Sequence, residues 1–338
     1  MTGFFDPLRV ASELTGTAGF PRPETVTPLP GGRNNRVWKV ECGASRFLLK
    51  RYFWSEADPR DRLGQEWAFL SYLRSIGCGA APAPLAKSSK DRSALLEFID
   101  GTPVLDVTAS DIDAASDFFL LINAGRDRAG SLPLVSEGCL SLKDHLEVVS
   151  GRVSRLEAIT PDDPEHAVAV DFVKRSIFPL WRCIEKRIRS RADRELTRVL
   201  PTEERCLSPS DFGFHNALRE ADGRLRFLDF EYAGWDDPAK TIIDFCNQPD
   251  RILPDDLAQA FRNRVLAAFP DPASLIRRIE LLEPLYQLKW ACICLNGFLP
   301  GRGFSDPRPD RSAEAHLQRA RIMASRAAES LDRMPHNC

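Results

Sequence analysis

The sequence predicts an α+β fold with a small β-rich lobe followed by a large, mainly α-helical lobe. Short runs in the first hundred residues alternate polar and apolar side chains, as half-buried strands do. Most segments after Gly101 instead repeat apolar residues at helical spacing. One further β-rich segment, at about 205–230, interrupts the helices. We therefore place the boundary between the lobes near Gly101, with lobes of residues 1–100 and 101–338.

The N-terminal lobe is expected to contain hairpins and one helix. Residues 36–41 alternate polar and apolar side chains, Gly43 marks a turn, and residues 46–52 form the next strand. Apolar residues three and four apart predict a helix over 61–75. The region of Pro82 and Pro84 is expected to be a loop, before another strand. That last strand begins at Ala94 and ends before the Asp-Gly-Thr-Pro turn.

The C-terminal lobe is expected to be mostly helix. Helical periodicity is found near residues 111–128, 141–157, 165–190, 256–268 and 273–298. The tail from Gly301 onward is rich in Arg and Ala, and it predicts a closing helix.

Composition excludes several classes of protein. The 338 residues include 46 Lys and Arg against 48 Asp and Glu, a formal charge of −2, which argues against a dedicated nucleic-acid binder. No apolar run approaches the ~20 residues of a membrane span, and the first residues do not resemble a secretory signal. The nine cysteines are scattered without a Cys-x-x-Cys pair, which suits free thiols. We expect a cytoplasmic protein with neither a membrane nor a nucleic-acid partner.

One predicted hairpin gathers polar side chains at its open end. An Asp-Gly pair at 222–223 between two strand-like runs predicts a two-residue loop. Counting from that loop places Asn216 opposite Asp229, with Cβ atoms about 4.5–5.5 Å apart. Asp211 enters from the loop before them. Such a set of oxygen ligands suits Mg²⁺. The alternative is a purely structural hairpin mouth, with Asn216 capping a strand and Asp229 in a salt bridge.

The pattern Asp211-x-x-x-x-Asn216, then Asp229-Phe-Glu, resembles a known pair of motifs. They are the catalytic loop and the metal motif of the aminoglycoside phosphotransferase and choline kinase-like families, small-molecule relatives of protein kinases. Other landmarks follow in the same order, over about residues 25–250: a glycine loop at 29–35, a strand lysine at Lys50, a helix glutamate at Glu66, a linker at 97–101 and an Asp-Asp-Pro segment at 236–238. The resemblance implies a bilobal protein-kinase-like fold, with the catalytic loop and metal hairpin at 205–231.

The resemblance also implies that ATP and Mg²⁺ are the cofactors. Lys50 would contact the α- and β-phosphates, and Glu66 would hold Lys50 by a charge-assisted hydrogen bond. The other expected nucleotide contacts are Gly31, Gly32 and Asn35 in the loop that covers the phosphates, and the backbone of Glu97, Phe98 and Ile99 along the adenine edge.

For the reaction itself, Asn216 and Asp229 would bind Mg²⁺, and Asp211 would orient the acceptor hydroxyl and take its proton. His215 is open to two interpretations, a base or, as we favour, a structural side chain. The chain departs from the families at Pro209-Ser, where they usually have His-Gly before the aspartate. The missing histidine normally supports the catalytic loop.

The expected function is transfer of the γ-phosphate of ATP to a hydroxyl of a small molecule, of the amino sugar, sugar or amino alcohol class. Acidic residues near 231–237 would suit a cationic acceptor, although solvated loops explain them as well. The alternative is a nucleotide-binding regulatory protein that has lost catalysis, as the missing loop histidine suggests. Retention of Asp211 argues against it. The sequence does not identify the acceptor, does not decide whether ATP or GTP is the phosphate donor, and does not give the oligomeric state.

Overall fold

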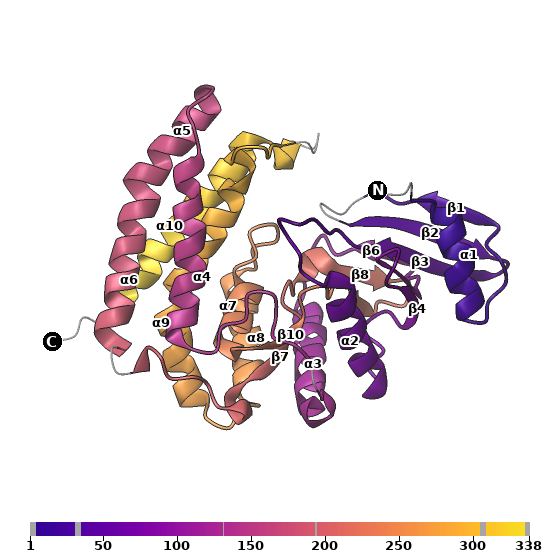
Figure 1. Ribbon diagram of the computed structural model, residues 1–338. Helices are drawn as coiled ribbons and strands as arrows, with labels where there is room; N and C mark the ends of the chain where they lie inside the picture. The colour runs from indigo at the N-terminus through magenta and orange to yellow at the C-terminus, as the bar shows by residue number, and fades with distance from the viewer. Residues whose placement is uncertain (1–4, 31–34, 131, 193–194, 305–308, 335–338) are drawn as a thin grey trace. The chain divides into compact units, whose positions relative to one another are not determined.

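The structure is a computed structural model, and it describes residues 5–30, 35–130, 132–192, 195–304 and 309–334 (Figure 1). Contacts divide the chain into two units. Unit 1 comprises Met1–Ser136 and Leu207–Trp235, and unit 2 comprises Glu137–Cys206 and Asp236–Cys338. Unit 1 carries the main sheet and unit 2 is mostly helical, as the α+β prediction requires. The lobe boundary near Gly101 stays a prediction.

A five-stranded antiparallel sheet forms the frame of unit 1, in the order β1-β2-β3-β5-β4. Its strands are β1 (Thr25–Pro28), β2 (Arg36–Cys42), β3 (Ser45–Arg51), β4 (Pro84–Ser88) and β5 (Ser93–Glu97). The expected loop around Pro84 is wrong, because β4 begins there. A proline is tolerated at the first residue of an edge strand, where its missing N–H costs no ladder bond.

Helices cover both faces of this sheet. Helix α1 (Pro7–Thr17), which the sequence analysis missed, packs Val10 and Leu14 into a core with Leu49 and its neighbours. Successive strand residues point to opposite faces, so Lys50 points away from α1. Helix α2 (Arg62–Ser75) supplies the partner of Lys50 described below, and it confirms the predicted helix.

The remainder of unit 1 is the helix α3 (Ala109–Ala124) and two small sheets. One sheet has the order β6-β8-β9, and in the other β10 pairs with β7. These strands are β6 (Gly101–Pro103), β7 (Cys206–Ser208), β8 (Ala217–Glu220), β9 (Leu225–Phe227) and β10 (Gly234–Asp236). They confirm the predicted β-rich segment at about 205–230.

The register predicted for the β8–β9 hairpin is wrong by one residue. The hairpin closes with three residues, 221–223, and the last of them, Gly223, has φ 88°. A type I turn followed by a left-handed residue is the usual three-residue alternative to the two-residue loop. Asn216 O therefore accepts a hydrogen bond from Leu228 N at 2.8 Å. Leu228, and not Asp229, is the residue opposite Asn216.

Unit 2 consists mainly of helices, and α4, α6, α9 and α10 pack side by side (Figure 1). Its helices are α4 (Leu142–Arg155), α5 (Pro164–Phe172), α6 (Phe178–Ala192), α7 (Pro238–Cys246), α8 (Asp255–Leu266), α9 (Pro272–Cys294) and α10 (Ala313–Arg333). A π-helical segment, Val173–Ile177, joins α5 to α6. All the helices predicted in this part of the chain are present, including the closing one, and α7 is an addition.

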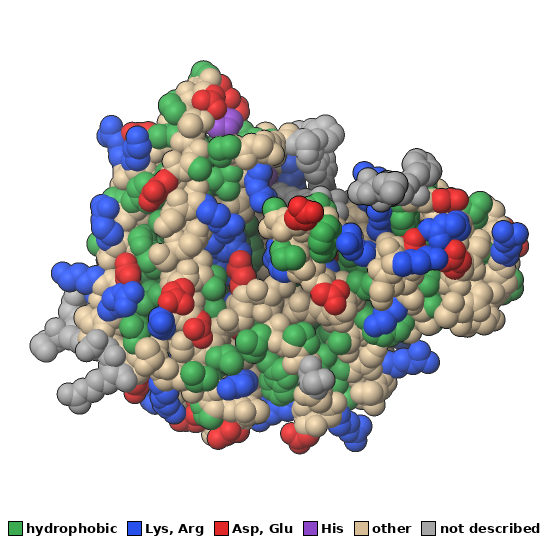
Figure 2. Space-filling model, in the orientation of Figure 1, with side chains coloured by type: hydrophobic (Ala, Val, Ile, Leu, Met, Phe, Trp, Pro, Cys, Tyr) green, Lys and Arg blue, Asp and Glu red, His purple; other side chains and the backbone are tan. Residues whose placement is uncertain are grey.

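Acidic and basic side chains are interspersed over the visible face of unit 2, in keeping with the small net charge of the chain (Figure 2). Within the described ranges, no helix is both long and apolar enough to cross a membrane. The cysteines that the structure describes are free thiols, and most of them are buried.

Candidate active site

Three of the predicted site residues meet in unit 1. Lys50 Nζ lies 2.6 Å from Glu66 Oε2 and 2.6 Å from Asp229 Oδ1. The side chains of Lys50 and Glu66 are 7% and 2% exposed, whereas that of Asp229 is 40% exposed. A strand, a helix and a loop thus bring one cation and two carboxylates together, and only the loop carboxylate is open to solvent.

A third carboxylate, Glu231, completes this cluster. Burial alone would lower the pKa of Lys50, but the carboxylates of Asp229, Glu66 and Glu231 hold it above its usual value. Lys50 therefore carries its charge at any physiological pH. Burial, and then the charge of Asp229, raises the pKa of Glu231. Arg62 Nε lies 3.6 Å from Glu231 Oε1, so two cations face three carboxylates. The excess of one carboxylate means that this part of the site attracts further positive charge.

The backbone at Asp229 is held in an unusual conformation. Asp229 has φ 65°, in the left-handed region that costs about 1–3 kcal/mol for such residues. Glu66 Oε1 accepts a hydrogen bond from Phe230 N at 3.0 Å, while Lys50 binds the Asp229 side chain. The contact with Glu66 fixes the backbone directly after Asp229, and the contact with Lys50 orients the Asp229 carboxylate in advance of any ligand.

The catalytic loop presents Asp211 with two partners. Asn216 Nδ2 donates to Asp211 O at 3.0 Å and lies 3.3 Å from Asp211 Oδ2. His215 Nε2 lies 3.2 Å from Asp211 Oδ1. The Asp211 side chain is 40% exposed. The loop therefore holds this carboxylate from two sides and leaves it accessible.

The segment before Asp211 departs from the families it resembles. Ser210 has φ 68°, a conformation that favours glycine, and glycine is the residue those families usually have there. The N–H of Ser210 donates to Ser208 Oγ at 3.1 Å, which compensates part of the strain. Pro209 replaces the usual histidine, but an imidazole still reaches Asp211 from His215. The sequence analysis treated His215 as structural and did not predict this contact.

The catalytic loop is tied to the metal motif by backbone. The hydrogen bond between Asn216 O and Leu228 N places Asp229 one residue beyond the pair. Asn216 donates its amide protons to Asp211, so its Oδ1 is the atom suited to a cation. These oxygens fit Mg²⁺, which takes one or two carboxylates and otherwise binds phosphates and water. The described residues contain no group of three or more His, Cys, Asp or Glu that could hold a metal by itself.

Asn35 is tied to the metal motif in a way that the sequence did not reveal. Asn35 Nδ2 donates to Glu231 Oε2 at 2.5 Å, and Asn35 Oδ1 accepts from Phe53 N at 3.0 Å. Asn35 is 9% exposed, so it anchors the end of the expected phosphate loop. Gly31 and Gly32, which were also predicted there, lie outside the described residues. The available signal for Glu231 was its place two residues after Asp229.

The linker is held by an arginine that the sequence analysis also missed. Glu97 Oε2 accepts from Arg226 Nη2 at 2.8 Å and from Ala83 N at 3.0 Å. The N–H of Glu97 donates to Ala83 O at 2.9 Å. The backbone of Glu97, Phe98 and Ile99 was predicted to meet an adenine edge, and the N–H of Glu97 is already used in this contact with Ala83.

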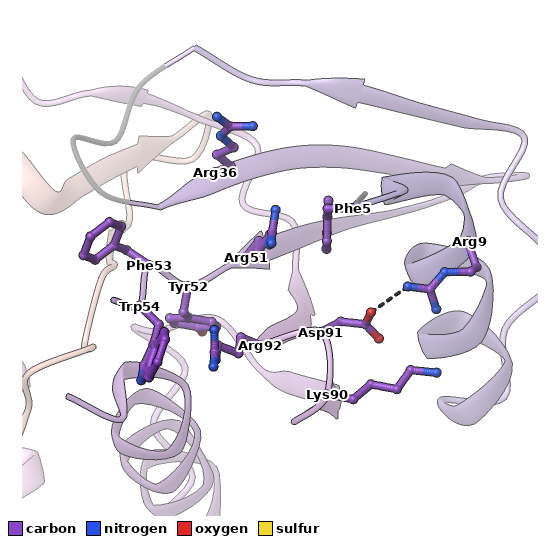
Figure 3. A pocket seen from close by; sticks show the side chains of 10 residues that line it. All are labelled: Phe5, Arg9, Arg36, Arg51, Tyr52, Phe53, Trp54, Lys90, Asp91 and Arg92. Carbon is purple, nitrogen blue, oxygen red and sulfur yellow. Dashed lines mark hydrogen bonds and ion pairs between the residues drawn. The ribbon is translucent and has the colours of Figure 1, made fainter. Parts of the chain in front are cut away.

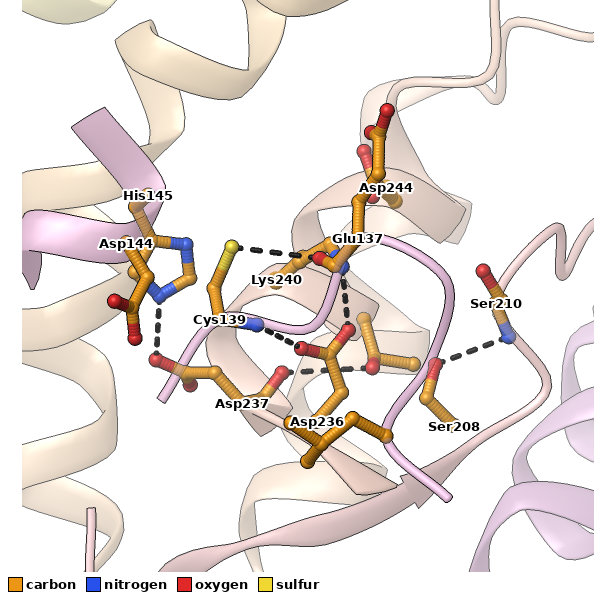
Figure 4. Close-up of polar contacts among 12 residues, drawn as sticks. Glu137, Cys139, Asp144, His145, Ser208, Ser210, Asp236, Asp237, Lys240 and Asp244 are labelled. Carbon is orange, nitrogen blue, oxygen red and sulfur yellow. Dashed lines mark hydrogen bonds and ion pairs between the residues drawn. The ribbon is translucent and has the colours of Figure 1, made fainter. Parts of the chain in front are cut away.

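The acidic residues after the metal motif belong to unit 2, and each of them contacts at least one cation. Figure 4 shows Asp236 with Lys240. Asp236 Oδ2 lies 2.7 Å from Lys240 Nζ. Asp244 receives both of its hydrogen bonds from Lys289 Nζ, at 2.7 Å each. These contacts agree with the structural role expected for Asp236 and Asp244.

A buried histidine belongs to the same network. His145 Nε2 lies 3.0 Å from Asp237 Oδ2, and both side chains are fully buried. Burial would lower the pKa of His145, but Cys139 and Asp237 raise it to about 9. Burial would raise the pKa of Asp237, but Arg278 and His145 lower it to about 2. The pair is therefore charged at neutral pH.

The sequence model of the phosphotransferase enzyme family matches residues 25–276. The comparison with curated proteins finds no match. A solved spectinomycin phosphotransferase, in complex with ADP and spectinomycin, has a TM-score of 0.62 at 13% identity, covering 96% of this chain and 98% of that one. At 13% identity, similarity to a solved structure supports the fold alone.

Two further solved structures are similar. A choline kinase from Streptococcus pneumoniae has a TM-score of 0.59 at 14% identity, with 94% of this chain and 98% of that one covered. A putative aminoglycoside phosphotransferase from Ralstonia eutropha JMP134 has a TM-score of 0.65 at 13% identity, with 98% and 100% covered. The expected kinase-like fold is confirmed.

Proposed function

Because the chain belongs to the phosphotransferase enzyme family and is a small-molecule kinase, we propose that it moves the γ-phosphate of ATP to a hydroxyl group. The reaction would depend on Mg²⁺, and the acceptor would be an amino sugar, a sugar or an amino alcohol. One observation carries the proposal: Lys50, Glu66 and Asp229 converge in the same unit as the Asp211–Asn216 loop, which a backbone hydrogen bond ties to the metal motif.

Lys50 would bind phosphate oxygens. Its ammonium group has three donors, and Glu66 and Asp229 each accept from it. When a nucleotide enters, Glu66 would keep the ammonium in place while phosphate oxygens take up its remaining hydrogen-bonding capacity. Glu66 is buried and also bound to the Phe230 N–H, so it has little freedom to move.

Mg²⁺ bound with the nucleotide would neutralise charge on the phosphates, which is most of what phosphoryl transfer requires. Asp229 and Asn216 would hold the ion. Asp211 would accept a hydrogen bond from the acceptor hydroxyl and take its proton, as the new O–P bond forms and the bond from the γ-phosphorus to the bridging oxygen breaks, with ADP as the leaving group. His215 and Asn216 would keep that carboxylate oriented toward the hydroxyl.

The direct test is acceptor-stimulated ADP release across a panel of sugars, aminoglycosides, amino alcohols and nucleosides. With an acceptor identified, Asp211→Asn should lower kcat by about 10²–10⁴-fold, because the positioned proton acceptor is lost. Asp222→Asn, in the exposed hairpin loop, is the matched control and should retain full activity. Full activity in Asp211→Asn would show the proposed mechanism to be wrong.

The acceptor class rests on the family and not on the acidic residues near 231–237. Glu231 is engaged by Asn35, and Asp236 by Lys240, so neither offers an open anionic surface. The solved structures named above are a spectinomycin phosphotransferase and a choline kinase, and both names support an acceptor that carries a cationic nitrogen. The acceptor panel should therefore include neutral sugars beside their amino analogues.

The second candidate is a nucleotide-binding regulatory protein without catalysis. The observation that favours it is Pro209-Ser in place of the usual His-Gly before Asp211. A single-turnover assay with γ-labelled ATP separates the two. Transfer of label to any acceptor supports the kinase, whereas tight nucleotide binding without transfer to any member of the panel supports the regulatory protein.

A further inference from the structure

A second concave site lies on the face of the main sheet that α1 covers. It is a cavity of about 450 Å³ in unit 1 (Figure 3). Its lining is aromatic and basic: Phe5, Arg9, Arg36, Arg51, Tyr52, Phe53, Trp54, Lys90, Asp91 and Arg92. Arg51 follows Lys50 in β3, so the two side chains leave the strand on opposite faces. The arginine side chain thus points to the face opposite Lys50, while Tyr52, which also lines the cavity, has its ring 5.0 Å from Lys50 Nζ.

Three arginines form a row across neighbouring strands of this cavity. Arg36 of β2 is directly opposite Arg51 of β3 in the register. Arg51 is in turn opposite Ser93 of β5, and Arg92 is the residue before Ser93. Strands are about 4.8 Å apart, so the row spans about 10 Å. Like charges placed directly opposite each other destabilise a sheet unless a counter-charge accompanies them.

The carboxylates near this row are already engaged. Asp91 lies 2.6 Å from Arg9, and Glu13 lies 2.7 Å from Arg9 and 3.0 Å from Lys90. Within the described part of the chain, no carboxylate forms an ion pair with any arginine of the row, which consists of Arg36, Arg51 and Arg92. Burial, and then Arg36 and Arg92, lowers the pKa of Arg51. Asp91 also lines the cavity and partly offsets the charge at Arg51, but its ion pair is with Arg9. The cavity therefore holds more positive than negative charge.

Aromatic rings, rather than carboxylates, hold two of these guanidinium groups. Arg51 lies over the ring of Phe5, 4.1 Å from its centroid, and Arg92 lies over Trp54 at 4.0 Å. Arg92 has φ 49°, and its carbonyl accepts from Tyr52 N at 2.8 Å. A strained backbone and a stacked ring thus fix the direction of Arg92. The N–H donors of a guanidinium group point outward in its own plane, so a group that lies over an aromatic ring can still donate to an anion.

We propose that this cavity binds a soluble ligand with two or more phosphate groups, held by Arg36, Arg51 and Arg92. Guanidinium groups recognise phosphate oxygens by paired N–H donors. A row of three over about 10 Å matches an oligophosphate better than a single phosphate. Trp54 is 40% exposed, so its indole ring is available for contact with the base of a nucleoside polyphosphate.

Binding of tripolyphosphate to the full chain, measured by titration calorimetry without Mg²⁺, tests the proposal. Arg51→Gln and Arg92→Gln should each weaken binding at least tenfold, with orthophosphate binding far more weakly than tripolyphosphate. Arg224→Gln, in the exposed β8–β9 hairpin, is the control and should bind normally. Lys50→Met removes the phosphate contact proposed at the active site, and it should retain the binding of tripolyphosphate that Arg51→Gln and Arg92→Gln weaken. Thermal melting of each variant establishes that it folds.

A second readout uses the unmodified protein. Tripolyphosphate should protect Arg51 and Arg92 from phenylglyoxal, mapped by mass spectrometry, and should leave Arg224 reactive. An ADP arm shows whether a base adds affinity at Trp54. The proposal is overturned if tripolyphosphate does not bind, if the Arg51 and Arg92 variants bind it normally, if binding depends on Lys50, or if only vesicles of anionic lipid bind to this face.

Discussion

Two clusters of buried charge lie in different units of the molecule and are built in different ways. In unit 1 three carboxylates surround Lys50. One of them, Asp229, has a partly exposed side chain and a left-handed backbone conformation. In unit 2 each acid contacts at least one cation: Asp236 contacts Lys240, Asp244 contacts Lys289, and Asp237 contacts His145 and Arg278. The side chains of Asp236, Lys240, Asp244 and Lys289 are buried in regular structure. The first cluster has more carboxylates than cations and has local strain, which are features of a site. The second has neither, and it serves stability.

The largest expected effect distinguishes these clusters by activity. Asp229→Asn should lower kcat by about 10²–10³-fold, because a charged group that acts on the transition state is lost. Its stability should change little, since Asn tolerates the left-handed conformation of this position. Steady-state kinetics and urea unfolding measure the two quantities. A stable variant with normal kcat would remove the distinction between the clusters.

The matched substitution in unit 2 should have the opposite result. Asp244→Asn leaves the buried Lys289 without its counter-charge, and breaking such a pair costs about 3–5 kcal/mol of unfolding free energy. Activity per folded molecule should be nearly unchanged. If Asp244→Asn were stable but inactive, the unit 2 cluster would belong to the catalytic machinery.

The pair of His145 and Asp237 predicts a dependence of stability on pH. The pKa of His145 is raised from about 6.5 to about 9, so its contribution is complete below pH 6.5 and is lost as the pH rises through 9. The pKa of Asp237 is lowered from about 3.8 to about 2, so its contribution is lost as the pH falls through that range. Urea unfolding of the wild type between pH 6 and 10 should show the alkaline decline, and His145→Gln should flatten it.

The smallest expected effect concerns strain beside the catalytic aspartate. Ser210→Gly should stabilise the protein by about 1 kcal/mol, because glycine adopts φ 68° without the steric cost of a side chain. The backbone N–H of residue 210 would still donate to Ser208 Oγ, so the loop keeps its geometry. A loss of stability would show that the Ser210 side chain makes a contact worth more than the strain. The urea midpoints of the wild type and of Ser210→Gly, compared at constant m-value, show whether the substitution stabilises or destabilises the protein.

The sequence predicted the residues of the site better than their pairing. Lys50, Glu66 and Asp229 could be found because each stands in a motif on a predictable element, and the structure brings them together. The hairpin register was missed because a glycine suits both a two-residue and a three-residue loop. The choice between the two loops depends on the backbone conformation around Gly223, which the sequence does not show.

Contacts between distant segments were beyond sequence analysis. The partners Asn35 and Glu231 are 196 residues apart, and no local pattern links them. The salt bridge of Arg226 to Glu97 depends on how two separate strands pack, so no local pattern predicts it. Helix α1, by contrast, had a visible start signal in Asp6 followed by Pro7, and the rule for helix starts would have found it.

The central claim is that Asp229 and Asn216 hold a divalent ion with the nucleotide, beside Lys50. Binding of Mn²⁺ with ADP, followed by electron paramagnetic resonance, tests it most directly, because it needs no acceptor. The wild type should bind the Mn²⁺–ADP pair, and Asp229→Asn should bind it at least tenfold more weakly, while Asp244→Asn binds it normally. Equal affinity in the wild type and in a folded Asp229→Asn variant would contradict the account.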